Sequence, residues 1–228
     1  MSGSRLAYLQ AMDIVVWRAR PMSALQTPVV IPEQDAPAPV IKPSDDAWHA
    51  LQSRVRECRA CRLHEGRTQT VFGVGDPQAQ WMVIGEGPGA DEDQQGEPFV
   101  GKAGQLLNAM LAAIGLARSA VYIANIVKCR PPNNREPAAD EVAACIGYLR
   151  AQINLIRPRL ILCVGKVAAN NLLGNDEAIG RMRGTVHRYQ NIPTIVTYHP
   201  AYLLRSPLEK RKAWDDLKMA RRVAQQGL

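Results

Sequence analysis

Residues 81–89, Trp-Met-Val-Ile-Gly-Glu-Gly-Pro-Gly, join an apolar run directly to a glycine-rich turn. Four consecutive apolar residues, Trp81 to Ile84, are typical of a strand covered on both faces of a parallel sheet. Glycines let the backbone approach a ligand closely, and open α/β sheets bind ligands beyond the carboxyl ends of their strands. Glu86 carries the one functional group of this turn. The stretch predicts an α/β domain with a ligand site here, although a tight turn with a solvated glutamate would give the same pattern.

Three further apolar segments follow this turn, at residues 121–127, 160–165 and 194–198. Strands that alternate with helices predict an α/β fold, a three-layer α/β/α sandwich around a mostly parallel, four-stranded sheet. The segment 86–101 is expected to be a long acidic loop. Helices are expected at residues 44–57, 102–114, 137–156, 166–173 and 208–225.

Polar side chains lie at or near the carboxyl ends of three predicted strands. Glu86 follows the first strand, Asn125 lies among apolar residues in the second, and His199 follows the fourth. Each has an ordinary structural explanation when it is considered alone. In a parallel sheet, however, the carboxyl ends of the strands lie at one edge, which predicts that these side chains line one crevice.

Residues 1–43 differ in composition from the rest of the chain. Residues 28–43 are rich in proline, alanine and valine, which predicts an extended, mobile linker. The expected organisation is therefore an N-terminal peptide with its linker, 1–43, and a folded domain, 44–228.

The formal net charge of the chain is +7. Most of this excess falls in the expected folded domain and suits a polyanion such as nucleic acid, although a moderately basic soluble protein would carry it equally well. No apolar run approaches the ~18 residues that a membrane span needs, and no secretory signal is visible. We expect a cytoplasmic protein with no membrane partner.

Five cysteines occur in the chain, and two of them form a Cys-x-x-Cys pair, Cys58 and Cys61. In a reducing compartment, such a pair with Cys129 and Cys145 indicates a metal site rather than disulfides. A structural zinc usually takes two close pairs, whereas iron–sulfur clusters accept less regular spacings, so the spacing favours a four-iron cluster. Four unrelated buried cysteines are the alternative. Cys163 lies in an apolar strand and is expected to be a core residue.

Three motifs resemble those of the family 4 uracil-DNA glycosylases. The first comprises residues 85–104, the second Asn125 with residues 128–135, and the third residues 199–205. The resemblance covers about residues 45–222, and the Arg/His-rich insertion of a covalently trapping relative is absent from the sequence. It implies the uracil-DNA glycosylase fold, hydrolysis of the N-glycosidic bond of uracil in DNA, and one 4Fe-4S cluster. The implied cluster ligands are Cys58, Cys61, Cys129 and Cys145.

The resemblance also implies roles for individual residues. Glu86 would orient or deprotonate the attacking water, and His199 would donate a hydrogen bond to O2 of the leaving base. Asn125 would read N3–H and O4 of uracil, because its carboxamide offers both a donor and an acceptor. Phe99 would stack on the base, and Glu92 would exclude the thymine methyl group. The implied uracil-binding residues are Gly87, Glu92, Phe99 and Asn125.

Residues that follow the second and third motifs are expected to contact DNA. Tyr202, Leu203 and Arg205 come just after His199 and are expected to enter the gap that a flipped base leaves. Arginines near the cysteines are expected to contact phosphates, although any one of them can equally be a solvated surface residue. The expected DNA-binding residues are Tyr202, Leu203, Arg205, Arg130 and Arg135.

Residues 6–26 are similar to the N-terminal peptide of the psi subunit of the bacterial replicative polymerase assembly. This similarity implies that the segment binds clamp-loader subunits, and docking of the segment on its own domain is the alternative. Two other functions stay open at this point, a catalytically silent adaptor of the clamp loader and an iron–sulfur redox protein. The joint presence of Glu86, Asn125 and His199 argues against an adaptor. We expect a monomer that acts on uracil in single- or double-stranded DNA.

Overall fold

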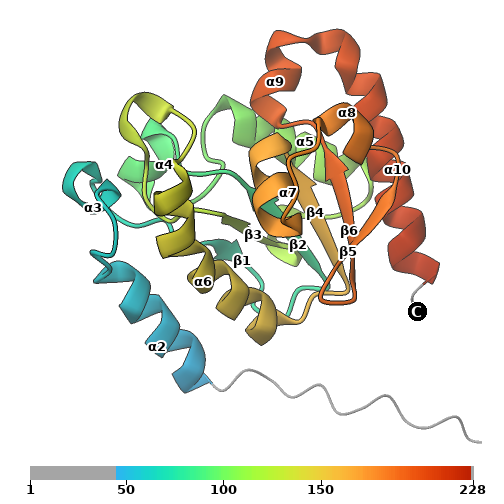
Figure 1. The fold of residues 1–228 in the computed structure, drawn as a ribbon. Coiled ribbons are helices and arrows are strands. Elements are labelled where there is room, and N and C mark those ends of the chain that lie inside the picture. The colour runs from blue at the N-terminus through green and yellow to red at the C-terminus, as the bar shows by residue number, and fades with distance from the viewer. Residues whose placement is uncertain (1–44, 227–228) are drawn as a thin grey trace, which may run out of the picture. The chain divides into compact units, whose positions relative to one another are not determined.

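Six strands form one sheet in the order β1-β3-β2-β4-β6-β5 in the computed structural model, which describes residues 45–226 (Figure 1). The four inner strands run parallel and confirm the predicted core of the sheet. The edge strands β1 (Val74–Gly75) and β5 (Val186–Tyr189) pair antiparallel and were not predicted, because neither contains a buried apolar run. The inner strands are β2 (Trp81–Gly85), β3 (Tyr122–Asn125), β4 (Leu160–Val164) and β6 (Ile192–Thr197).

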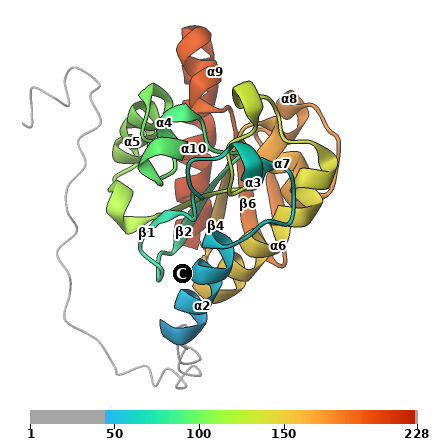
Figure 2. The ribbon, with the colours of Figure 1, turned by 90° about the vertical axis from the view of Figure 1, so that its left-hand side faces the viewer.

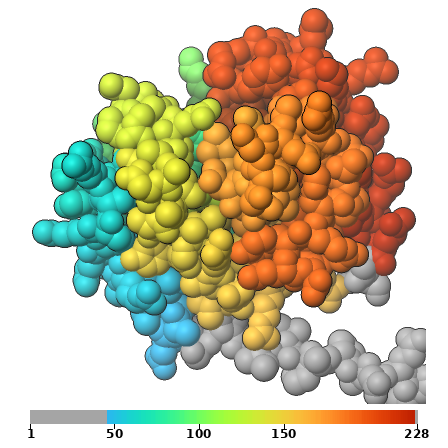
Figure 3. Space-filling view, viewed as in Figure 1, coloured from blue at the N-terminus to red at the C-terminus, as the bar shows by residue number. Residues whose placement is uncertain are grey.

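Helices cover both faces of the sheet, so the predicted three-layer sandwich is confirmed (Figure 2). The helices α6 (Ala139–Ile156) and α7 (Lys166–Leu173) pack on one face, and they hide the sheet in the space-filling view (Figure 3). The other face is covered by α5 (Lys102–Ala113), α9 (Pro200–Arg205) and α10 (Lys210–Gln226). Shorter elements complete the described chain: α2 (Asp45–Arg56), α3 (Leu63–Gly66), α4 (Ala90–Gln95), α8 (Ile179–Met182), η1 (Arg118–Ala120), η2 (Pro132–Asn134) and η3 (Pro207–Glu209).

The strand β2 shows why its sequence lacks the usual alternation of apolar and polar residues. All five of its residues are buried. Met82 and Ile84 pack toward α6 and α7, whereas Trp81 and Val83 pack toward α5 and α10. Both faces of this central strand are therefore core, as the apolar run predicted.

The segment 86–101 contains the helix α4, so the prediction of a long loop was wrong there. The helix is polar all round and gives no apolar periodicity that sequence reasoning could detect. Its first turn is stabilised by the carboxylate of Glu92, which accepts a hydrogen bond from the Gly89 N–H at 3.0 Å. Gly96, with φ of 78°, ends it in the left-handed conformation.

The predicted N-terminal peptide and linker, 1–43, and the psi-like segment 6–26 lie outside the described residues. The folded part begins with α2, whose bounds agree with the predicted helix 44–57. Between residues 45 and 226, no helix combines the length and the apolar character needed to cross a membrane.

Candidate active site

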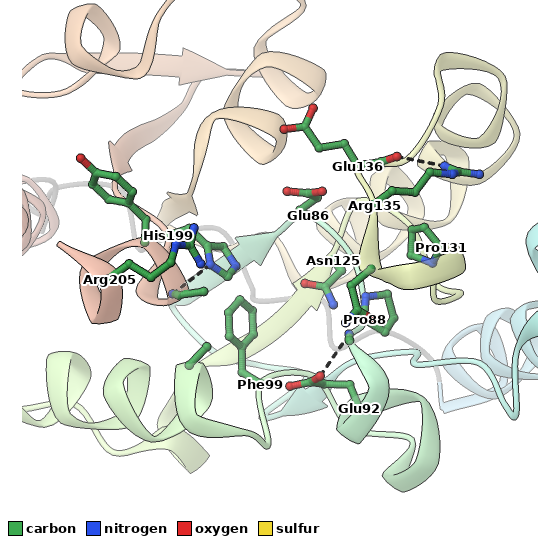
Figure 4. Close-up of a pocket in the computed structure, with 16 residues that line it drawn as sticks. Glu86, Pro88, Glu92, Phe99, Asn125, Pro131, Arg135, Glu136, His199 and Arg205 are labelled. Atoms are coloured by element: carbon green, nitrogen blue, oxygen red, sulfur yellow. Dashed lines mark hydrogen bonds between the residues drawn. The ribbon is translucent and has the colours of Figure 1, made fainter.

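A cavity of about 490 Å³ opens at the carboxyl ends of the parallel strands (Figure 4). After β2 the chain forms β3 on one side of β2 and then returns to form β4 on the other side of β2. Open α/β sheets bind ligands at such a reversal of strand order. The volume lies within the range of about 300–1,000 Å³ that is typical of small-molecule sites.

The structure brings Glu86, Asn125 and His199 together in this cavity, as the strand-end argument predicted. Asn125 pairs in register with Gly85, so the carboxamide lies beside the turn that carries Glu86. Gly87, Glu92 and Phe99 also line the cavity. All six predicted catalytic and uracil-binding residues therefore surround one space, while their individual roles stay predictions.

The carboxamide of Asn125 has an unpaired acceptor. The residue is 2% exposed, and its Oδ1 has no hydrogen-bond partner within the described part of the chain. A side-chain carbon on Gly85 would lie 2.5 Å from this oxygen, so glycine is needed beside it. A buried acceptor without a donor costs about 1–3 kcal/mol, so this oxygen is available to accept a hydrogen bond from a group that enters the cavity.

Phe99 adopts a left-handed backbone conformation, with φ of 55°. Such a conformation is strained for an aromatic residue and needs support from its surroundings. Arg118 donates to the carbonyl of Phe99 at 3.3 Å and to that of Pro98 at 2.5 Å. The Phe99 ring centroid lies 5.6 Å from that of His199, so the phenyl ring is held at the wall of the cavity.

Glu92 braces the two loops that frame the cavity. Its Oε2 accepts from the Gly89 N–H at 3.0 Å, and its Oε1 accepts from the Val100 N–H at 3.0 Å and from the Gly101 N–H at 3.4 Å. These bonds join the turn after β2 to the residue that follows Phe99. Sequence reasoning missed this positioning role. Exclusion of the thymine methyl group by Glu92 stays a prediction.

His199 is held in one tautomer. The backbone N–H of Ala201 donates to Nδ1 of the ring at 3.1 Å, so the proton of the neutral ring lies on Nε2. Burial, and to a smaller extent the charge of Arg205, lower the pKa of His199 to about 4 against an opposing effect of Glu92. The ring is therefore a neutral donor at neutral pH. Gly165, with φ of 102°, leaves room for it, because a side-chain carbon there would lie 3.2 Å from Cβ of His199.

Glu86 is a weak acid in this site. Burial, and to a smaller extent the negative charge of Glu136, raise the pKa of Glu86 to about 7. Glu136 lines the same cavity, and Figure 4 shows its side chain extending on the same side as Glu86. Sequence reasoning missed Glu136, because an exposed glutamate in a loop carries no distinguishing signal.

Four of the five predicted DNA-binding residues divide into two groups. Tyr202, Arg205 and Arg135 line the cavity. The guanidinium of Arg135 forms a bidentate pair with Glu141, at 2.8 and 2.6 Å. Arg130 instead lies in a neighbouring hollow that shares Pro131 with the main cavity. It therefore belongs to the adjoining surface rather than to the base pocket.

The prediction that Leu203 enters the gap left by a flipped base was wrong. Leu203 is 1% exposed and packs in the core beneath α5 and α10. The next residue, Leu204, is 43% exposed. The helix α9 determines this difference, because successive residues of a helix point in different directions, and the sequence alone did not reveal α9.

Four cysteines, Cys58, Cys61, Cys129 and Cys145, line one small cavity between α2, the loop after β3, and α6. No three metal-binding side chains of residues 45–226 meet at one point, as a single ion would require. In a 4Fe-4S cluster each thiolate binds a different iron, so the sulfurs surround the group instead of meeting at a point. Four thiols around one enclosed space are a donor set that a 4Fe-4S cluster would use.

Hydrogen-bond donors surround the sulfur atoms of this site. Arg67 Nη1 donates to Cys129 Sγ at 3.0 Å, and the Lys128 N–H donates to Cys145 Sγ at 3.2 Å. Such donors stabilise thiolates and tune iron–sulfur groups. Burial raises the pKa of Cys145 to about 11, with Lys128 opposing the shift, so a positively charged metal centre suits this thiol. Cys163 is fully buried in β4, which confirms it as a core residue.

The chain belongs to the uracil DNA glycosylase superfamily, whose family model matches residues 72–218. Within that superfamily it is similar to the type-4 uracil-DNA glycosylase of Archaeoglobus fulgidus, with 45% identity over 180 residues, 74% of this chain and 90% of the relative. The type-4 enzyme of Thermotoga maritima is 43% identical over 164 residues, covering 71% and 85%. A type-5 enzyme of Pyrobaculum aerophilum is 33% identical over 147 residues, covering 57% and 64%.

Proposed function

We infer that this chain is a uracil-DNA glycosylase, which hydrolyses the N-glycosidic bond of uracil in DNA and so starts base excision repair. The observation that supports this most directly is the unpaired Oδ1 of Asn125, which faces a cavity shared with Glu86 and His199. Uracil offers an N–H at N3 for this oxygen and an acceptor at O4 for the amide nitrogen. Cytosine has no N3–H and carries an amino group instead of O4, so it would leave buried groups unpaired.

Recognition requires that the base leave the helical stack. Unstacking costs a few kcal/mol, which stacking and hydrogen bonds in the pocket must offset. The ring of Phe99, fixed at the cavity wall, is placed to stack on the flipped base opposite the backbone of Gly87. Tyr202 and Arg205 line the same cavity, and the exposed Leu204 lies between them in α9, so these residues suit contact with the strand from which the base departs.

The chemistry divides between two side chains. The bond between C1′ and N1 breaks, and its electron pair passes to the base, where O2 carries much of the negative charge. The Nε2–H of His199 donates to that oxygen, and a preorganised donor of this kind is typically worth about 2.7–4 kcal/mol. Ionised Glu86 stabilises the sugar cation. It also accepts a proton from the attacking water as the water oxygen bonds to C1′. The products are free uracil and an abasic sugar.

We propose that the four-cysteine site holds one 4Fe-4S cluster. The ligands would be Cys58, Cys61, Cys129 and Cys145, and the cluster would connect the start of the domain to the loop after β3. Cys129→Ser should lower the iron content and the visible absorbance, whereas Cys163→Ser should leave both unchanged. Equal iron in both variants would contradict this assignment.

The test of the enzymatic function uses oligonucleotides that carry one uracil, with matched cytosine and thymine controls. The wild-type protein should excise uracil, so that alkali then cleaves the uracil-containing oligonucleotide and neither control. Glu86→Ala, Asn125→Ala and His199→Ala should each slow single-turnover excision by on the order of 100-fold or more and leave DNA affinity largely intact. A wild-type protein that binds DNA without excising uracil would instead indicate a silent adaptor.

We also propose, from the sequence alone, that residues 6–26 bind clamp-loader subunits and that the enzyme works as a cytoplasmic monomer. A pull-down with wild-type protein and with Trp17→Ala should recover clamp-loader subunits with the wild type alone. Equal recovery of clamp-loader subunits by both proteins would contradict the proposed role of this segment. Light scattering with size-exclusion chromatography tests the monomer.

A further inference from the structure

Lys128 carries its amine into the interior of the domain. The side chain is 1% exposed, and its Nζ donates to the carbonyl of Asn125 at 3.0 Å and to Oε1 of Gln152 at 2.6 Å. Within residues 45–226, the ion pairs of the structure include no carboxylate for this amine. Lysine is almost never fully buried without a charged partner, so its position here calls for a specific explanation.

The same residue joins two sites. Its backbone N–H donates to Cys145 Sγ at 3.2 Å, and it lines the four-cysteine cavity. Its amine holds the carbonyl of Asn125, the residue whose carboxamide lines the uracil cavity. Lys128 therefore connects the two sites directly, through hydrogen bonds to Cys145 on one side and to Asn125 on the other.

Gln152 makes this link rigid. The side chain is fully buried in α6, and its amide nitrogen donates to the carbonyl of Phe72 at 2.9 Å and to the hydroxyl of Tyr122 at 3.2 Å. Its Oε1 is thereby fixed in the direction of Lys128. Buried polar networks in which the members are satisfied rigidify the surrounding structure.

We propose that Lys128 is a positioning residue for uracil recognition, which rests on the proposed function. Asn125 ends β3, and beyond it the chain turns toward Cys129, so the register of its carboxamide depends on how this strand end is held. The amine of Lys128 donates to the backbone carbonyl at that strand end and is itself fixed by its hydrogen bond to Gln152. Displacement of a positioned group by about 1 Å can cost on the order of 100-fold in rate.

The first test is Lys128→Met, which keeps an unbranched side chain of similar shape, one heavy atom shorter, and removes both hydrogen bonds from Nζ. Iron content, visible absorbance and DNA affinity should stay at wild-type values, while single-turnover excision of uracil falls on the order of 100-fold. Lys166→Met, at an exposed lysine of α7, is the matched control and should retain the wild-type rate. Loss of activity in strict proportion to loss of iron would overturn the proposal, because Lys128 would then serve cluster assembly alone.

A double-mutant cycle separates positioning from general damage. If Lys128 acts through Asn125, adding Lys128→Met to Asn125→Ala should change the residual rate by less than about threefold. Full additivity in iron-replete proteins would overturn the proposal. If Lys128→Met does not fold, Gln152→Leu replaces it in the cycle, and the same criterion of additivity decides. A wild-type protein without uracil excision would instead refute the proposed function.

Discussion

The backbone N–H of Ala201 donates to Nδ1 of His199 and thereby fixes the proton of the ring on Nε2. Ala201 is in the first turn of α9, so the helix that follows β6 sets the tautomer of the residue that precedes it. This contact makes His199 a hydrogen-bond donor toward the cavity without requiring that the ring be charged.

His199→Ala should slow single-turnover excision by about 10²–10³-fold, because a preorganised donor to the developing charge on O2 is lost. Because burial holds the pKa of His199 at about 4, its ionisation should produce no change in the wild-type rate between pH 5.5 and 8. The ratio of the wild-type rate to the variant rate, measured across this pH range, checks both points, because the ionisation of Glu86 affects both proteins. His49→Ala, at an exposed histidine of α2, is the control and should behave as wild type.

Glu136→Gln should shift the pH dependence of excision toward lower pH. The pKa of Glu86 is raised to about 7 by burial and then by Glu136, and the mechanism needs ionised Glu86, so the wild-type rate should rise with pH through a midpoint near 7. Removal of the second charge lowers that midpoint. Single-turnover rates at saturating enzyme, with the remote exposed Glu57→Gln as control, measure it. An upward or absent shift would count against the coupling.

Glu86→Gln should stabilise the protein above pH 7 while it abolishes rapid excision. In the folded state the pKa of Glu86 is about 7, above its ordinary value of 4.5, so the folded protein loses stability as pH rises between these values. The neutral amide avoids this loss, and its advantage should vanish below about pH 4.5. Thermal unfolding of both proteins at pH 4 and pH 8 tests the sign. A larger stabilisation at pH 4 would contradict it.

Gly85→Ala should damage uracil recognition more than overall stability. The added carbon would lie 2.5 Å from Oδ1 of Asn125 and 2.7 Å from Cζ of Phe99, so both recognition groups must move. Such crowding typically costs about 1–3 kcal/mol of stability. Excision should fall on the order of 100-fold. Gly147→Ala is the control, because a side-chain carbon there meets nothing within 4 Å.

Leu203 and Leu204 are neighbours in α9, one buried and one exposed, and form a matched pair for substitution. Leu203→Ala should lower the free energy of unfolding by about 2–5 kcal/mol, because the side chain is removed from the core. Leu204→Ala should change it by no more than about 0.5 kcal/mol and should weaken DNA contact instead. Denaturant unfolding and DNA binding of both variants measure the contrast. Equal losses of stability would show that our assignment of the two faces of α9 is wrong.

Long apolar or amphipathic segments were predictable, and short or polar ones were not. The run Trp81 to Ile84 specifies a central strand, because four consecutive apolar residues can all be buried only in a strand that is covered on both faces. The helix α4 lacks any apolar stripe, and its caps come from Glu92 and Gly96 after the chain has folded. The helix α9 is equally short, which is why the sequence did not reveal that Leu203 and Leu204 lie on different faces of a helix.

The sequence by itself determined the four inner strands and the longer helices along the chain, the residues at the strand ends, and the four cysteines, because periodicity and spacing are local properties of the chain. Tertiary structure alone decided the tautomer of His199, the acidity of Glu86 beside Glu136, the strained backbone of Phe99 and the link through Lys128. Each of these depends on burial and on contacts between segments distant in sequence. Such contacts exist after the chain has packed, and no local pattern encodes them.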